Sequence, residues 1–130
     1  MKAYWDSSAL ISACQEVALR QRLASERGFS RRHALAETFS ALTGKAHLRL
    51  MADKAALLLA DLAQDLDFIE LGTDEILKAA TDALSLGIRG GAIHDLLHAR
   101  AALKSGSNEF LTMDRNDFTN LLPGMSIGQV

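Results

Sequence analysis

The feature that most constrains this chain is the alternation of short strand-like runs with longer stretches of helical periodicity. Runs suited to strands occupy residues 2–5, 27–30, 67–71, 109–113 and 126–130. Between them, helical patterns begin near residue 8, cover 35–42 and 48–62, and continue over 73–87 and 90–104. Because helices of this length can serve as crossover connections, we predict a three-layer α/β/α sandwich with a small central parallel sheet.

Local signals delimit several of these elements. Residues 6–8, Asp-Ser-Ser, end the first strand and favour a helix N-cap. Gly44 ends a helix whose apolar stripe consists of Leu35, Phe39 and Leu42. The next helix is predicted from a longer stripe, which comprises Leu48, Met51, Ala55, Leu58, Leu59 and Leu62.

Length and composition favour a single domain over residues 1–130. The chain has one proline, Pro123, and neither repeats nor low-complexity stretches that would indicate a linker. One cysteine, Cys14, rules out an internal disulfide and fits a reducing compartment. Asp6 interrupts any signal-peptide core, and no apolar stretch approaches the roughly 20 residues that span a bilayer. We therefore expect a cytoplasmic protein without membrane association.

The charge is divided unevenly along the chain. The net charge of −2 taken alone argues against a nucleic-acid partner. Residues 1–50, however, hold eight Lys and Arg against four Asp and Glu, whereas residues 51–130 hold six against twelve. Either the acidic helices of the second half are simply solvated, or the two halves divide substrate contact and acidic chemistry between them.

Two aspartates follow predicted strands. Asp6 and Asp114 each stand where a strand ends, and ligands of open parallel sheets bind beyond the carboxyl ends of the strands. If the two strands are neighbours, the carboxylates meet in one crevice and repel each other unless a hard divalent cation such as Mg²⁺ lies between them. The alternative is that both are turn or N-cap residues, a common use of Asp.

Two further acids lie within predicted helices. Asp95 has Ala92, Ala99 and Ala102 on its own face, which indicates a closely packed surface, although a first-turn acid that stabilises the helix is an equal alternative. Glu37 lies opposite the apolar stripe of its helix, and this position is typical of a solvated glutamate.

Four segments together resemble the PIN-domain family, in particular the VapC type of toxin ribonuclease. They occur in the family's order across nearly the whole chain. The matching segments are 6–11 (Asp-Ser-Ser-Ala-Leu-Ile), 36–38 (Ala-Glu-Thr), 91–95 (Gly-Ala-Ile-His-Asp) and 111–114 (Leu-Thr-Met-Asp), the last continuing to Asp117 and Phe118.

The resemblance implies a metal-dependent endoribonuclease with an acidic centre. The acids that it implies as catalytic residues and as ligands of Mg²⁺ or Mn²⁺ are Asp6, Glu37, Asp95 and Asp114. The supporting residues that it implies are Ser8 and Thr112, with Asp117 as an additional acid of undecided role. The reaction is hydrolysis of an RNA phosphodiester, in which the cation orients water and stabilises charge on the phosphate. We expect Asp6→Asn to abolish cleavage with little loss of stability.

Substrate affinity has to come from cations near these acids. Arg31 and Arg32, followed by His33, precede the helix of Glu37 and are the first candidates for RNA binding, with Lys45 and Arg49 as outer contacts. A solvated surface charge is the alternative for each of them. Single-stranded or looped RNA is the expected substrate because paired bases are hard to reach.

The resemblance also implies partners. Proteins of the VapC type are usually encoded beside a small antitoxin that inhibits them, and they tend to form homodimers. A solitary PIN nuclease and an inactive PIN-fold module that binds RNA are the alternatives within the same fold.

A different chemistry starts from His94 and His98, four residues apart on one predicted helix. Two histidines at this spacing are typical of zinc hydrolases. The zinc-protease motif has Glu where this chain has Asp95, and no third ligand follows, so a zinc hydrolase is the less favoured alternative.

Overall fold

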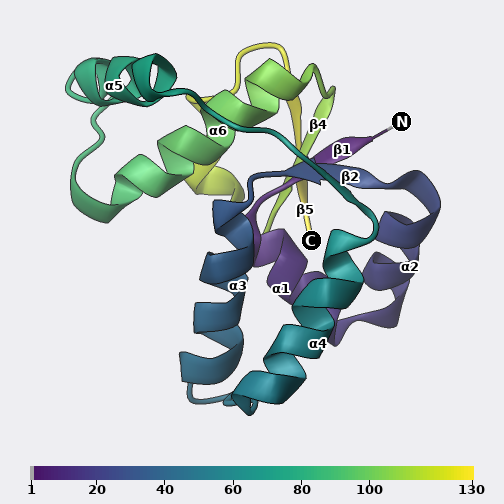
Figure 1. Ribbon diagram of the computed structural model, residues 1–130. Coiled ribbons are helices and arrows are strands. Elements are labelled where there is room, and N and C mark those ends of the chain that lie inside the picture. Colours follow the sequence, from purple (N-terminus) through teal and green to yellow (C-terminus); the bar gives the residue numbers. More distant parts are fainter. Residues whose placement is uncertain (1) are drawn as a thin grey trace.

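The computed structural model describes residues 2–130 and has a parallel sheet at its centre (Figure 1). The strands are β1 (Ala3–Trp5), β2 (Gly28–Ser30), β3 (Leu66–Phe68), β4 (Glu109–Thr112) and β5 (Ser126–Gln129). The helices are α1 (Ser7–Gln15), α2 (Val17–Glu26), α3 (His33–Gly44), α4 (Ala52–Ala63), α5 (Thr73–Asp82) and α6 (Ile93–Ser105), with 3₁₀ turns η1 (Gly90–Ala92) and η2 (Arg115–Phe118). Every strand pairing is parallel, and the order is β3-β2-β1-β4-β5.

The order of the strands places β1 beside β4 in the middle of the sheet. Tyr4 pairs with Phe110 and Trp5 with Leu111, so the chain leaves both strands at the same edge. The backbone N–H of Asp6 continues this ladder by donating to the Leu111 carbonyl at 3.2 Å. The first strand and a strand more than 100 residues later therefore end side by side, as the open parallel sheet requires for a shared crevice.

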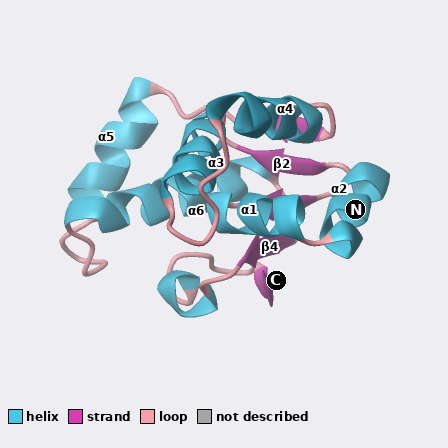
Figure 2. Ribbon diagram, turned by 90° about the horizontal axis from the view of Figure 1, so that it is seen from below, coloured by secondary structure: helices cyan, strands magenta, loops and turns pink. Residues whose placement is uncertain are grey.

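Alternation along the strands separates two apolar cores. Ala3, Trp5 and Leu111 pack with residues of α1, α2, α3 and α4 on one face, whereas Tyr4 and Phe110 pack with α5, α6 and the η2 region on the other. Figure 2 shows α5 and α2 at opposite ends of the molecule. This arrangement confirms the predicted three-layer α/β/α sandwich with a parallel sheet.

The helix predicted from residue 8 is two helices. Its break is at Glu16, whose extended backbone (φ −122°, ψ 118°) ends α1 and begins α2. Neither glycine nor proline stands at the break, so the local sequence gives no sign of it.

Two apolar stripes differ from their predictions. On α3 the buried side chains include Ala34, Thr38 and Ala41, whereas Leu35 and Phe39 are only partly buried. The helix predicted from Leu48 begins at Ala52, because the chain turns at Arg49, whose φ is +43°, before α4 starts. Met51 is consequently exposed rather than part of the core.

None of the helices in the described part of the chain has both the length and the apolar character needed to cross a membrane.

Candidate active site

Asp6 follows β1 directly and starts α1. Its Oδ1 accepts the backbone N–H of Ala9 at 2.9 Å, which is the hydrogen bond of an N-cap. Asp6 is therefore an N-cap residue, as the structural alternative predicted. It also lies at the carboxyl edge of the sheet, where ligands of parallel sheets bind.

Two hydroxyl groups hold the Asp6 carboxylate in place. Ser8 Oγ donates to Oδ1 at 2.7 Å, and Thr112 Oγ1, from the end of β4, donates to Oδ2 at 2.7 Å. The same hydroxyls accept backbone N–H groups of the next segment, Met113 to Ser8 and Asp114 to Thr112. Burial raises the pKa of Asp6, while the hydrogen bonds from both hydroxyls and from the Ala9 N–H act in the opposite direction. Ser8 and Thr112, predicted as supporting residues, thus both contact the Asp6 carboxylate.

Asp95 lies in the first turn of α6 and is half-buried. Burial raises the pKa of its carboxyl to about 6, and the negative charges of Asp117, Asp6 and Asp114 add to the effect. Three aspartates, from the ends of β1 and β4 and from η2, therefore lie close enough to act on Asp95. We call Asp6, Asp95, Asp114 and Asp117 the aspartate cluster.

The aspartate cluster lacks cationic partners. In the described residues, the carboxylates of Asp95, Asp114 and Asp117 accept no hydrogen bond and form no ion pair, whereas most acids elsewhere on the surface are paired with Arg or Lys. Unneutralised carboxylates at close range are unfavourable without a bound cation.

Glu37 lies among histidines. Its Oε1 accepts a hydrogen bond from His98 Nε2 at 2.8 Å. Burial acts to raise its pKa, but this bond and the charges of His98, His33 and His94 outweigh it, so the pKa of Glu37 lies below its ordinary value. Glu37 is half-buried, so the prediction of a solvated glutamate from the helical wheel is wrong. The reason is that α3 buries the face with Ala34, Thr38 and Ala41, which is next to Glu37, and not the face with Leu35 and Phe39.

His98 connects Tyr4 of β1 with Glu37, a role that the sequence analysis did not predict. Its Nδ1 is 2.8 Å from the Tyr4 hydroxyl, and both side chains are buried. Its spacing from Asp95, three residues on the same helix, was the available sign that the two share a face. Because protein groups bond both ring nitrogens of His98, the pair His94 and His98 considered for zinc has only one free imidazole.

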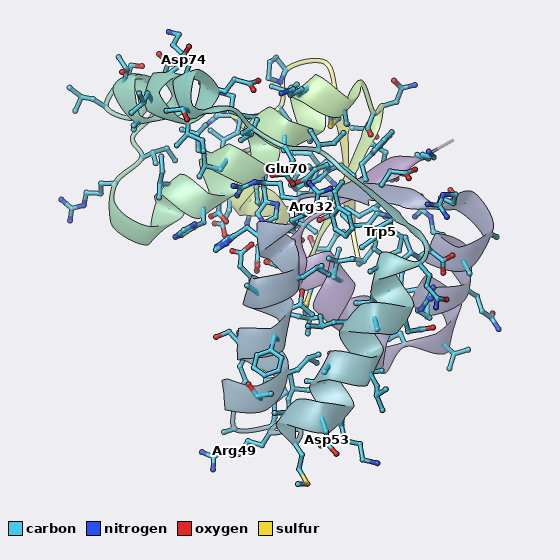
Figure 3. The ribbon with its side chains drawn as sticks, in the orientation of Figure 1. Trp5, Arg32, Arg49, Asp53, Glu70 and Asp74 are labelled. Atoms are coloured by element: carbon cyan, nitrogen blue, oxygen red, sulfur yellow. The ribbon has the colours of Figure 1, made fainter. Side chains whose placement is uncertain are left out.

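The predicted RNA-binding arginines differ in their surroundings. Arg32 forms an ion pair with Glu70 at 2.7 Å and lies over the Phe68 ring, so its charge is already matched (Figure 3). Arg31 is half-buried, forms no ion pair within the described residues, and is near enough to Tyr4 for its charge to lower that hydroxyl's pKa against the dominant effect of burial. Of the two, only Arg31 retains an unmatched charge beside the site.

A hollow of about 220 Å³ extends from the site toward the α3–α4 connection. It begins at Ser8, Met113 and Asp114 and is lined farther out by Lys45 and His47. Arg49 lies at the tip of the connection, distant from Arg32 (Figure 3). The basic groups that border the acidic centre thus include Lys45, predicted as an outer contact, and His47, which the sequence did not single out.

The donor set of the aspartate cluster fits a hydrated Mg²⁺ or Mn²⁺. All its ligand atoms are carboxylate oxygens, which hard cations prefer. The aspartates are more widely spaced than the one group of three potential ligands that meets within 4.8 Å among the described residues, which is His33, Glu37 and His94. Since Mg²⁺ usually keeps several waters, carboxylates at such spacing can hold it through water as well as directly.

No family model matches this chain, and none of the curated proteins matches it. The fold and the site together define an α/β/α protein with an acidic centre at the carboxyl edge of its sheet.

Proposed function

We propose that this protein is an endoribonuclease of the PIN-domain type, dependent on Mg²⁺ or Mn²⁺, whose centre is the aspartate cluster. The observation that supports it best is the convergence of unpaired aspartates from β1, β4, α6 and η2 at one edge of the sheet, with the pKa of Asp95 raised to about 6. Such a cluster needs a divalent cation for neutral charge balance. When bound, the cation supplies activation of water and stabilisation of charge on the scissile phosphate.

Each acidic side chain has its own role in this proposal. Asp6 is fixed by Ser8, Thr112 and its own N-cap bond, so it offers a rigid oxygen donor. Asp95 comes from α6, and its raised pKa reflects the burial and the repulsion between carboxylates that a bound cation would relieve. Asp114 and Asp117 close the cluster from the β4 side. Glu37 is held by His98, whose charge also acts on Asp95, and it completes the acidic set that the family resemblance implies.

The substrate in this proposal is single-stranded RNA. The hollow that leads from Asp114 to Lys45 and His47 gives a phosphate backbone a cationic border beside the acids. Arg31, which lies near Tyr4, adds a further cation. Unpaired RNA can bend a phosphodiester into such a site more readily than a duplex.

We further propose that the protein acts as the toxin of a type II toxin–antitoxin pair, inhibited by a cognate antitoxin and assembled as a homodimer. This role rests on the resemblance of the four sequence segments to VapC-type proteins. We expect growth arrest when the chain is expressed alone, and no arrest with Asp95→Asn. Unimpaired growth with abundant, folded, RNA-cleaving protein would leave a solitary nuclease as the explanation.

The decisive experiment is cleavage-site mapping on total RNA. We expect the purified protein to cut at discrete sites with Mg²⁺ or Mn²⁺, and to lose at least 100-fold in rate with EDTA or with Asp95→Asn. Asp74→Asn is the matched control, because Asp74 is an exposed acid in the first turn of α5, away from the cluster (Figure 3).

Two results contradict the nuclease proposal. Cutting that persists in EDTA excludes dependence on a divalent cation. Retention of RNA binding without any cleavage, in wild type and in Asp95→Asn alike, identifies an inactive binding module.

A further inference from the structure

A second group of possible metal ligands lies beside the aspartate cluster. His33, Glu37 and His94 each offer a ligand atom, and these three atoms all lie within 4.8 Å of one another. The imidazoles of His33 and His94 stack with centroids 5.6 Å apart and an angle of 17° between the rings. Two nitrogens and one carboxylate oxygen therefore converge at one point on the surface.

The fold produces this convergence from two helices. His33 and Glu37 are four residues apart on α3 and so share one of its faces. His94 comes from the first turn of α6, on the other side of the sheet edge, and its ring stacks on that of His33. Glu37 is the half-buried member, and the two histidines are exposed.

Glu37 is already oriented for such a role. The hydrogen bond from His98 Nε2 fixes one carboxylate oxygen, and the Tyr4 hydroxyl holds the other side of the His98 ring. Buried hydrogen-bond partners that orient a ligand are typical of protein metal sites and strengthen binding about 10- to 100-fold.

We propose that His33, Glu37 and His94 bind one divalent transition-metal ion of the zinc class, at a site distinct from the aspartate cluster. Two imidazoles with one carboxylate suit Zn²⁺ and its neighbours in the first transition row, whereas Mg²⁺ favours an all-oxygen set. Three protein ligands leave the fourth position to water or another small ligand.

The distances are compatible with this assignment. Zinc bonds of 2.0–2.2 Å in tetrahedral geometry separate ligand atoms by about 3.4 Å. The exposed imidazoles of His33 and His94 can close the remaining gap by rotating their side chains, while Glu37 stays fixed. The open side faces a groove of about 580 Å³ along α3, which His33 and Glu37 line together with Ser40 and Lys45.

The site has a consequence for catalysis, and this consequence rests on the proposed nuclease function. Glu37 is also the fourth acid that the family resemblance implies for the nuclease centre, so a zinc ion bound to it withdraws that carboxylate from catalysis. Zinc at the histidines therefore inhibits RNA cleavage without displacing Mg²⁺ from the aspartates.

Calorimetric titration of the metal-free full chain with Zn²⁺ tests the binding site itself. We expect one tight site, unaffected by millimolar Mg²⁺, with affinity at least tenfold lower in His33→Ala and in His94→Ala. His47→Ala is the matched control, since His47 is an exposed histidine outside the group. Unchanged zinc affinity in both His33→Ala and His94→Ala, or an equal loss in His47→Ala, overturns the assignment.

Cobalt gives a second readout that does not depend on activity. The visible absorption of bound Co²⁺ should appear in wild type and in Asp95→Asn, and should disappear in His33→Ala while the melting temperature of the metal-free protein is unchanged. A cobalt spectrum that depends on Asp95 instead would place the ion in the aspartate cluster and refute the separate site.

Zinc inhibition is measured last, on RNA cleavage with Mg²⁺ present. We expect inhibition of wild type and at least tenfold weaker inhibition of His33→Ala. If zinc binds as proposed and the protein cuts no RNA, the nuclease proposal fails and the metal site stands. If RNA is cut and zinc does not bind at the histidines, the metal site fails and the nuclease proposal stands.

Discussion

Asp6 belongs to the helix and to the acidic centre at the same time. It caps α1 through the Ala9 N–H and receives hydroxyl hydrogen bonds from Ser8 and Thr112. Removing its charge therefore changes local structure as well as chemistry. The expectation from the sequence that Asp6→Asn leaves stability nearly unchanged overlooked these three bonds.

For Asp6→Asn we expect loss of cleavage together with a loss of about 1 kcal/mol in the free energy of unfolding. The amide oxygen of Asn can keep the cap, but its NH₂ group would face the Thr112 hydroxyl, which donates to the carboxylate in the wild type. Asp6→Ala removes all three bonds, including the cap, and should cost about 2–3 kcal/mol. Urea denaturation of the metal-free proteins measures both. Equal stability of Asp6→Ala and wild type would contradict the described hydrogen bonds.

Substitution of Asp95 by Asn should raise stability, whereas the same substitution at Asp6 lowers it. Its folded pKa of about 6 lies above the unfolded value, so the folded state keeps a proton that the unfolded state has lost between about pH 4 and 6. Stability without metal therefore falls as pH rises through that window, and the cost is fully present at neutral pH. The whole pKa shift corresponds to roughly 3 kcal/mol, which we reduce because the side chain is half solvated, so we expect Asp95→Asn to raise stability at pH 7 by about 1 kcal/mol.

Melting temperatures measured from pH 4 to 8 test this prediction. The gap between Asp95→Asn and wild type should grow as pH rises from 4 to 6 and then stay constant. Addition of Mg²⁺ should narrow the gap at neutral pH, since a bound cation favours the ionised carboxylate. A gap that does not vary with pH would show that Asp95 does not titrate in this range.

At the residue scale, the positions of the aspartates could be predicted from the sequence, whereas the surroundings of Glu37 could not. Asp6 and Asp114 were predictable because each ends a strand, and parallel strands end at one edge. Glu37 was placed by resemblance alone. Its environment depends on His98 and Tyr4, which come from a different helix and from the sheet, and no local pattern encodes that contact.

At the scale of elements, β2 stands close to Trp5 because residue 28 is glycine. A Cβ at this position would lie 2.7 Å from Trp5 Cδ1 and 2.9 Å from Leu23 Cδ1, closer than packed atoms approach. The Ser30 hydroxyl at the end of the same strand donates to the Trp5 carbonyl at 2.7 Å. Strand β2 is thus fitted closely to β1 and α2.

Gly28→Ala should lower the free energy of unfolding by about 1–3 kcal/mol, because the large Trp5 side chain has to move. Gly44→Ala is the control: nothing lies within 4 Å of a Cβ there, and helix propensity should raise stability by up to about 0.5 kcal/mol. Denaturant midpoints of the two variants measure the difference. A similar midpoint for both would contradict the tight packing at β2.

Most strands and the later helices could be predicted from periodicity and caps, and the errors have physical causes. The break at Glu16 has no glycine or proline, since an extended backbone there is open to any residue. The late start of α4 depends on Arg49, whose positive φ is rare for its residue type and is not encoded by a turn motif. On α3, small residues rather than Leu and Phe face the core because α1 and α4 pack closely against it.

At the scale of the whole molecule, RNA binding has to overcome a net charge of −2. Few cations border the acidic centre, so each of them should contribute measurably to RNA affinity. We expect Lys45→Ala, tested in an Asp95→Asn background, to weaken binding of a labelled single-stranded RNA several-fold and to reduce the slope of log affinity against log salt by about 1.

Fluorescence anisotropy at several salt concentrations measures this slope. Lys78→Ala is the control, because Lys78 lies on α5 and is paired with Asp82 at 2.7 Å. Equal slopes for Lys45→Ala and the parent protein would show that the hollow beside Asp114 does not hold the phosphate backbone.

The pairing of β1 with β4 also sets when the centre can exist. Asp6 is synthesised more than 100 residues before Thr112 and Asp114, and β4 has to insert beside β1 before the hydroxyl of Thr112 reaches the first carboxylate. A nascent chain therefore carries only separate halves of its acidic centre until translation has passed β4.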